Sequence, residues 1–293
     1  MNRVRYLIVD ANNALHRCHY AQSLTDRKGR PVSGTFGIMK MVRSLTRQFR
    51  PRFVIVAWDQ GKSAERLALY PEYKAQREAS RSTEDKEAIA RQRADCQRIF
   101  STLPVRQVMV DGIEADDAIG VLCEQLTGRK VIISNDHDFV QLVKDDTELW
   151  LPNKNLLLTP ATVEKFLGFP VKHYVLWKCL VGDTSDNIKG IHGIGPKKAT
   201  AIILNGLGGG KKPAINAEQQ KILDRNKYLI TIGAVLKPAQ VDAVLSLHKK
   251  EKTKTIDFEP VRMAFVRMGF KSLYFNFDLW SAPFKRLIKK VSG

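Results

Sequence analysis

Four short apolar runs, each followed by acidic residues, constrain the fold of this 293-residue chain more than any other feature. The runs cover residues 6–10, 53–59, 105–110 and 130–136, and their β-branched residues favour strands. Helical patterns occupy the intervening segments, at residues 35–49, 82–103 and 115–126. Strands that alternate with helices form βαβ units, so we predict an α/β fold with a mostly parallel sheet flanked by helices.

The charge balance predicts a polyanionic partner. The chain has 48 Lys and Arg against 30 Asp and Glu, a net charge of +18. Such an excess favours binding to nucleic acid or to an anionic membrane surface. Residues 1–170 carry 26 basic and 21 acidic residues, whereas residues 171–293 carry 22 and 9. The second part is therefore the expected polyanion surface, and the acids of the first part need a separate explanation.

Neither a membrane span nor a secretory signal is expected. No window approaches the roughly 18 consecutive apolar residues of a span, and the N-terminus carries Arg3 and Arg5 just before the first strand. The four cysteines have no paired spacing, which is typical of a reduced protein. We therefore predict a cytoplasmic protein.

Other phosphate-binding, metal-binding and nucleophile motifs are incomplete. Residues 61–63, Gly-Lys-Ser, lack the glycine that a nucleotide P-loop carries five residues earlier, where Val56 stands. His16, Cys18 and His19 have no second pair at zinc spacing. No Gly-x-Ser-x-Gly nucleophile elbow is present.

Acidic residues follow all four predicted strands. A single acid at a strand end is most often a helix cap or a turn residue. Because the carboxyl ends of parallel strands meet at one edge of a sheet, four in succession predict a cluster. Its members are Asp10, Asp59, Glu114, Asp116, Asp117, Asp136 and Asp138.

Crowded carboxylates repel one another unless a cation neutralises them, and oxygen ligands select Mg²⁺ or Mn²⁺ over zinc. Two such ions about 4 Å apart hydrolyse phosphodiesters in many enzymes. Asp183 and Asp186 are either two further ligands or parts of a solvated turn.

Residues 188–203 have the pattern of a helix-hairpin-helix. Gly193 and Gly195 flank a turn, and Pro196 suits the first position of a helix. The glycines, the free N–H groups of that helix, Lys197 and Lys198 would hold a phosphate backbone without reading its sequence. A plain Gly-Pro turn is the alternative.

About 45 residues separate Asp59 from the third predicted strand, which is long for a connection. The segment is either a solvated helical excursion or a cationic cover over the acidic edge. In the second interpretation, Lys74 and Arg77 reach a scissile phosphate and Tyr73 stacks on an unpaired base.

Taken together, the motifs resemble the flap endonuclease and 5′ nuclease family, which includes the 5′ nuclease domain of bacterial DNA polymerase I and the flap endonucleases of bacteriophages. The resemblance covers roughly residues 6–235. The matching segments are Asp10 with Asn13 and Arg17, residues 59–77, Gly112 to Asp117, Ser134 to Asp138 and Gly182 to Gly195.

The resemblance implies a PIN-like domain at residues 1–168, with a helical arch at about 62–103. A helix-hairpin-helix part of the helix-three-turn-helix type would follow at 169–240. We expect the aromatic-rich residues 241–293 to pack back on the core.

The resemblance also implies roles for individual residues. The first metal site would comprise Asp10, Asp59, Glu114, Asp116 and Asp136, and the second Asp138, Asp183 and Asp186, with Asp117 as a further acid of the cluster. Lys74 and Arg77 would stabilise the scissile phosphate. Arg17, Lys178, Lys197 and Lys221 would contact DNA, and the hairpin at Gly193 and Gly195 would carry a potassium ion.

The predicted function is a metal-dependent 5′→3′ exonuclease and 5′-flap endonuclease in replication, repair or primer removal. We expect two Mg²⁺ ions, replaceable by Mn²⁺, and a monomer acting on DNA with a 5′ flap, nick or 5′ end, with RNA–DNA left open. Two alternatives remain: a non-catalytic DNA-binding module with structural acids, and a PIN-type ribonuclease.

Overall fold

The structure is a computed structural model and describes residues 3–76, 82–208, 215–249 and 256–288. Arg77 of the predicted arch lies outside the described residues. At the centre is a six-stranded sheet in the order β3-β2-β1-β4-β5-β6, parallel except for β6. Its strands are β1 (Tyr6–Asp10), β2 (Phe53–Ala57), β3 (Arg106–Val108), β4 (Lys130–Ile133), β5 (Thr147–Leu151) and β6 (Leu156–Leu158).

The order of the strands creates a crevice beside β1. The chain builds outward from β1 through β2 to β3, then crosses to the other side of β1 to add β4. Ligands of open α/β sheets bind at such a reversal, beyond the carboxyl ends of the strands. The predicted parallel sheet is confirmed, whereas β5 and β6 were not predicted.

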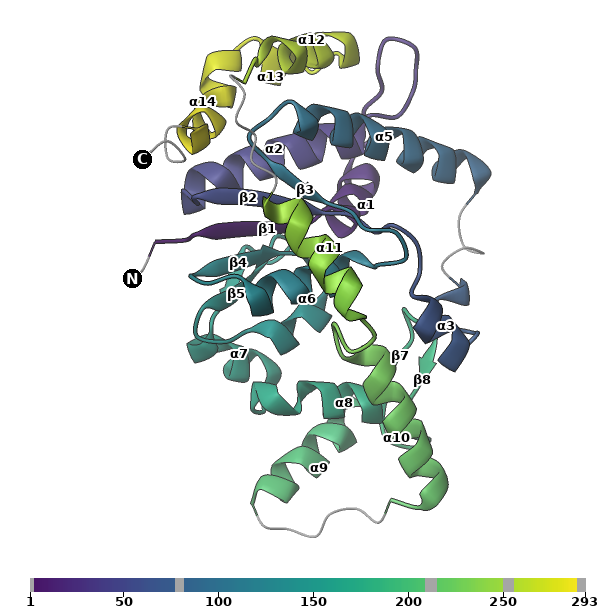
Figure 1. The fold of residues 1–293 in the computed structure, drawn as a ribbon. Helices are drawn as coiled ribbons and strands as arrows, with labels where there is room; N and C mark the ends of the chain where they lie inside the picture. Colours follow the sequence, from purple (N-terminus) through teal and green to yellow (C-terminus); the bar gives the residue numbers. More distant parts are fainter. Residues whose placement is uncertain (1–2, 77–81, 209–214, 250–255, 289–293) are drawn as a thin grey trace.

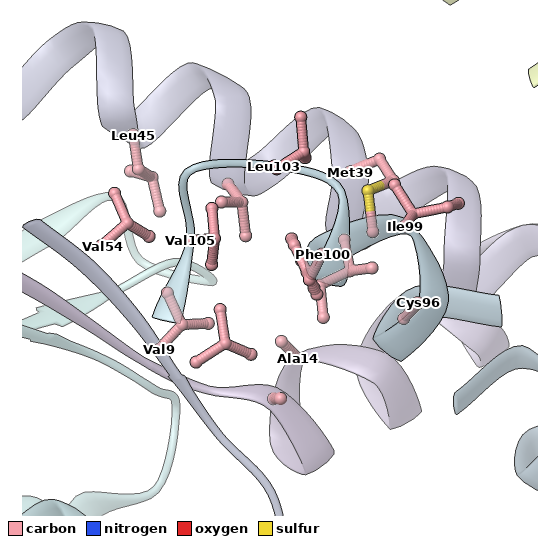
Figure 2. Packing of buried hydrophobic residues seen from close by; sticks show 14 of the residues in the cluster. Val9, Ala14, Met39, Leu45, Val54, Cys96, Ile99, Phe100, Leu103 and Val105 are labelled. Atoms are coloured by element: carbon pink, nitrogen blue, oxygen red, sulfur yellow. The ribbon is translucent and has the colours of Figure 1, made fainter. Parts of the chain in front are cut away.

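One face of the sheet is covered by helices from the first third of the chain. These are α1 (Ala11–Ala21), α2 (Ser33–Phe49) and α5 (Thr83–Ser101). Because strand side chains alternate between faces, Leu7 and Val9 point to this layer, where Phe100 is fully buried. Figure 2 shows how Val9 and Val54 from the sheet lie near Phe100 and Val105 in this core.

The opposite face buries Tyr6, Ile8 and Ile132 beneath a second layer. Its elements are α6 (Ala115–Gln125), the 3₁₀ helix η1 (His137–Leu142), α7 (Pro160–Leu167) and α11 (Pro238–Lys249). The sheet thus lies between two layers of helices (Figure 1).

A helical lobe lies below α6 and α7 (Figure 1). It contains η2 (Val171–His173), α8 (Tyr174–Val181), β7 (Gly182–Asp183), β8 (Ile188–Lys189), α9 (Pro196–Leu207) and α10 (Ala217–Ile230). Pro196 begins α9, as the sequence predicts. Asn226 of α10 donates to the carbonyl of Cys179 in α8 at 3.0 Å and to that of Lys189 in β8 at 2.8 Å. These two hydrogen bonds fix α10 to α8 and β8.

The chain ends in α12 (Glu259–Met268), α13 (Lys271–Tyr274) and α14 (Phe277–Ile288), which lie over α2 and α5 (Figure 1). Phe265, Phe270, Trp280 and Phe284 are buried in the same core cluster as β1 and α2, so these aromatic residues do pack on the core. Among the described residues, none of the helices has the length and apolarity to cross a membrane.

Candidate active site

A cleft of about 930 Å³ lies at the carboxyl edge of the sheet. It is lined by side chains from segments far apart in sequence, because parallel strands deliver their ends to one edge. The acids that line it are Asp10, Asp59, Glu114, Asp116, Asp136, Asp138 and Asp186. Six of the seven acids predicted from the strand ends line this cleft, the exception being Asp117, and Asp186 joins them from the loop between β7 and β8.

Asp10 and Asp59 form the centre of the cluster. Asp10 ends β1 and caps α1, accepting from the Asn13 N–H at 3.1 Å and from the Ser134 hydroxyl at 2.8 Å. Asp59 accepts from the Ala115 N–H at 2.7 Å and from the Asn12 amide. Burial, followed by the nearby Asp59 charge, raises the pKa of Asp10 to about 7.

Asp136 and Asp138 face the same space from the end of β4. Asp136 caps η1 by accepting from the Asp138 N–H at 2.8 Å. Burial raises the pKa of both carboxyls, and the neighbouring Asp136 charge helps to bring that of Asp138 to about 6. Such shifts arise where carboxylates are buried close to one another.

The start of α6 contributes three carboxylates whose oxygens lie within 4.8 Å of one another: Glu114, Asp116 and Asp117. Glu114 is buried and accepts from Arg66 at 2.7 Å, Tyr73 at 3.0 Å and Lys74 at 2.8 Å. Asp116 is half-buried and lines the cleft.

Asp117 has a structural environment and does not line the cleft. It is fully buried, and Arg66 donates to its two oxygens at 2.6 and 2.9 Å. The Gly233 N–H adds a third bond at 2.7 Å. Because both oxygens are already engaged, Asp117 would have to give up these bonds to hold a metal ion, and its role as a ligand stays a prediction.

Asp183 ends β7, and Asp186 lies in the loop between β7 and β8. The Ser185 N–H and hydroxyl donate to Asp183 Oδ1 at 2.8 and 2.7 Å, and Lys178 donates to Oδ2 at 2.6 Å. Burial acts to raise the Asp183 pKa, but the Lys178 charge and these hydrogen bonds outweigh it and lower the pKa. Asp186 Oδ2 lies 3.7 Å from Lys74 Nζ.

Tyr73 and Lys74 belong to the predicted arch segment at about residues 62–103, and Lys74 lines the cleft. Lys74 has a left-handed backbone, with φ of 56°, and its ammonium pairs with Glu114 and Asp186 at the cleft wall. The Tyr73 ring is only 2% exposed, packs beside the Lys74 ammonium and donates to Glu114. The Tyr73 ring is therefore covered by protein in this structure, and its stacking on a base stays a prediction.

The donor set of the cleft fits a hard divalent cation. All of its charged ligand atoms are carboxylate oxygens, which such cations prefer, and their raised pKa values express an electrostatic cost that a bound cation would remove. Asp10, Asp59, Asp116 and Asp136 would hold one ion, and Asp138, Asp183 and Asp186 a second.

Residues 5–168 match the family described as 5′-3′ exonuclease, N-terminal resolvase-like domain. This match covers more than half of the chain. The chain belongs to the 5′-3′ exonuclease family.

Two curated relatives place the chain within this family. A thermostable DNA polymerase I of Thermus filiformis is 30% identical over 291 residues, covering 94% of this chain and 33% of the polymerase. A 5′-3′ exonuclease of Aquifex aeolicus is 30% identical over 200 residues, covering 67% of this chain and 68% of the exonuclease. The chain thus spans a third of the polymerase and about two thirds of the exonuclease.

The fold is that of a solved flap endonuclease of bacteriophage T5, determined in complex with DNA and metal ions. The TM-score is 0.64 at 20% identity, and the match covers 99% of this chain and all of that one. This likeness confirms the predicted PIN-like fold.

The other predicted DNA contacts in this 5′-3′ exonuclease family member differ in accessibility. Lys197, Lys198 and Lys221 are exposed, and Lys198 donates to the Gly193 carbonyl at 3.3 Å across the predicted hairpin. Arg17 lines the cleft and donates to Asn153 at 2.6 Å. These positions leave their DNA-binding roles as predictions.

Lys178 differs from those lysines. Its side chain is 14% exposed, and its ammonium lies between Asp138 and Asp183 at 2.9 and 2.6 Å. In this structure the Lys178 charge is paired within the protein, and its contact with duplex DNA stays a prediction.

Two cleft residues were missed by the sequence reasoning. Tyr20 is 57% exposed at the cleft, packed edge-on against His19, and its hydroxyl donates to Asp85 of α5 at 3.4 Å. Arg93 of α5 also lines the cleft and donates to the Asp59 carbonyl and to Gln60. The available signal was helical phase: Tyr20 lies on α1 seven residues after Asn13, which is close to two turns, and Asn13 also lines the cleft.

Proposed function

We propose that this chain is a divalent-metal-dependent 5′→3′ exonuclease and structure-specific 5′-flap endonuclease acting on DNA. The observation that carries the proposal is the convergence of Asp10, Asp59, Asp116 and Asp136 on one cleft with Lys74 in its wall. Family membership and the shared fold support it.

The acidic and basic residues of the cleft would have different roles. The carboxylates would hold two Mg²⁺ ions, or Mn²⁺ in their place, which supply a hydroxide nucleophile and stabilise the charge of the phosphate. Lys74 brings a cation to the same cleft, where it would pair with a non-bridging oxygen of the scissile phosphate. Arg17 and Arg93 add positive charge to the walls and would position the adjoining strand.

The helical lobe would hold the duplex. Lys197, Lys198 and Lys221 are exposed on α9 and α10, and the first turn of α9 carries the N–H groups that bind phosphate at helix starts. Such contacts recognise the backbone and not the base sequence. We also propose that residues 193–195 bind a potassium ion. The protein would act as a monomer in the cytoplasm.

Cleavage of defined substrates tests the proposal. A 5′-labelled flap, a nicked duplex and a single strand are incubated with Mg²⁺, Mn²⁺ or EDTA, and the product lengths are read. We expect cleavage near the flap junction with either metal and none in EDTA. A matched RNA flap at the same salt separates this activity from a ribonuclease.

Asp136→Asn tests the metal site directly. Loss of one ligand charge should lower turnover by at least about 100-fold while DNA binding stays measurable. Asp278→Asn is the control, because Asp278 lies on α14 with its side chain 95% exposed. Full cleavage by Asp136→Asn in Mg²⁺ would remove this residue from the site, and no cleavage by the unmodified protein would favour a DNA-binding module.

A further inference from the structure

The Lys178 ammonium bridges two acids that come from different elements. Lys178 lies in the last turn of α8, Asp138 belongs to η1 and Asp183 to β7. Its Nζ is 2.9 Å from Asp138 Oδ1 and 2.6 Å from Asp183 Oδ2. The Tyr174 hydroxyl donates to the same Asp138 oxygen at 2.9 Å.

This arrangement places a cation where two carboxylates share charge. Asp183 has its other oxygen engaged by Ser185, so the oxygen facing Asp138 is the one that holds the ammonium. Asp183 is 8% exposed, and two such acids left without a cation would repel each other in a poorly solvated space.

Asp10 and Asp59 contrast with this pair. Their carboxylates accept only from amide, hydroxyl and backbone N–H donors among the hydrogen bonds of the described residues. Lys74 pairs with Glu114 and Asp186, and Lys178 pairs with Asp138 and Asp183. A divalent cation at Asp10 and Asp59 therefore displaces neither of these lysines, whereas one at Asp138 and Asp183 meets an ammonium already in place.

We propose that Lys178 is the internal counterion of the Asp138–Asp183 pair and that a divalent cation binds this pair only by displacing its ammonium. The inference rests on the proposed metal-dependent function and goes further, because it makes the two ion sites unequal. A lysine suits exchange, since its ammonium sits on a flexible four-carbon stem that can swing toward solvent. The site near Asp10 fills first, and the site at Asp138 fills at higher metal concentration.

Calorimetric titration with Mn²⁺ alone, without DNA, tests the inference. The unmodified chain should bind two ions with separate affinities. Lys178→Met removes the ammonium and keeps an unbranched apolar stem, so the weaker ion should bind at least about tenfold tighter and the stronger one should be unchanged. Lys172→Met is the matched control, because Lys172 is exposed on η2.

The metal-free state gives a second readout. In EDTA, Lys178→Met should melt at a lower temperature than the unmodified chain because its acids lose their counterion, and Mn²⁺ should abolish that difference. Lys178→Arg keeps the charge and should leave the second ion weak, so it tests the same inference if Lys178→Met does not fold.

The outcomes separate the two proposals. If the unmodified chain binds no divalent ion, both the metal-dependent function and this inference fail. If it binds two ions and Lys178→Met binds the second no more tightly, or if Lys178→Arg gains affinity, the counterion role is wrong while the proposed function stands.

Discussion

At the scale of single residues, the cleft acids differ in their partners more than in their type. Asp10 and Asp59 accept hydrogen bonds from neutral groups, whereas Glu114 and Asp183 each accept from a lysine ammonium. A carboxylate with neutral donors keeps its charge available for a metal ion. Partners therefore separate the acids that are ready to bind a cation from those that must first exchange one.

Asp117 is predicted to act on stability. Asp117→Ala would leave the Arg66 guanidinium, 1% exposed, without its main partner, which should destabilise the fold by about 3–5 kcal/mol. Chemical denaturation compares it with Asp278→Ala, an exposed acid whose loss should change little. Unchanged stability together with lost metal binding would instead identify Asp117 as a ligand.

Tyr20 is predicted to be the base-stacking residue of the cleft, in place of Tyr73. Its exposed ring is oriented by His19 and Asp85, so Tyr20→Ala should raise KM for a 5′ single strand by about fivefold or more, and Tyr20→Phe should raise it little. Phe275→Ala, 73% exposed on the far helices, is the control. Equal loss in Tyr20→Phe would point to the hydroxyl and not to the ring.

At the scale of elements, the hairpin between α8 and α9 depends on two glycines that face each other. Gly182 has φ of 83°, and a side chain there would meet the Gly190 N–H nitrogen at 2.4 Å. A Cβ on Gly190 would meet the Val181 carbonyl carbon at 2.3 Å. The backbone around Gly182 thus lies in close contact with the backbone around Gly190. This contact closes the short segment between them, which carries Asp183 and Asp186.

Gly190→Ala should therefore disturb both the fold and the loop acids. Because the clash is with backbone, which cannot move aside easily, we expect about 1–3 kcal/mol of destabilisation, measured by denaturation, and weaker binding of the second metal ion. Gly206→Ala is the matched control inside α9, where a Cβ has open space. Gly206→Ala should leave the free energy of unfolding unchanged or raise it by roughly 0.5–1 kcal/mol. A loss of stability in Gly206→Ala as large as that in Gly190→Ala would show that α9 tolerates no substitution.

At the scale of the whole molecule, the net charge of +18 conceals an acidic cleft whose field depends on pH. The folded Asp10 pKa of about 7 lies above its ordinary value of 3.8. The folded state thus holds this proton more tightly than the unfolded state, so Asp10 makes the metal-free protein less stable as the pH rises from about 4 to about 7.

Metal binding should reverse that trend, because a ligand carboxyl must lose its proton first. We predict that the rise in melting temperature caused by Mg²⁺ is larger at about pH 8 than at about pH 6. Thermal melts with Mg²⁺ and with EDTA at both pH values measure it. A rise that is equal, or larger at the lower pH, would show that Asp10 and Asp138 do not bind the ion.

The sequence alone determined the parallel sheet, the acids at its edge and the position of α9, because periodicity, strand-end residues and the Gly-Pro boundary are local signals. It also determined the family through ordered motifs. It did not predict β5 and β6, whose apolar segments have weak boundaries, nor the exposed ring of Tyr20.

Only the tertiary structure decided which acids line the cleft and which are paired with a buried cation. Asp117 and Asp136 look alike in sequence, yet Arg66 reaches Asp117 from α3 (Ala64–Leu69), while Asp136 faces the cleft. Tyr73 and Lys178 looked available for DNA, but folding buries the ring and pairs the ammonium with two acids. The reason is physical: exposure and ion pairing depend on contacts between residues far apart in the chain, which no local pattern records.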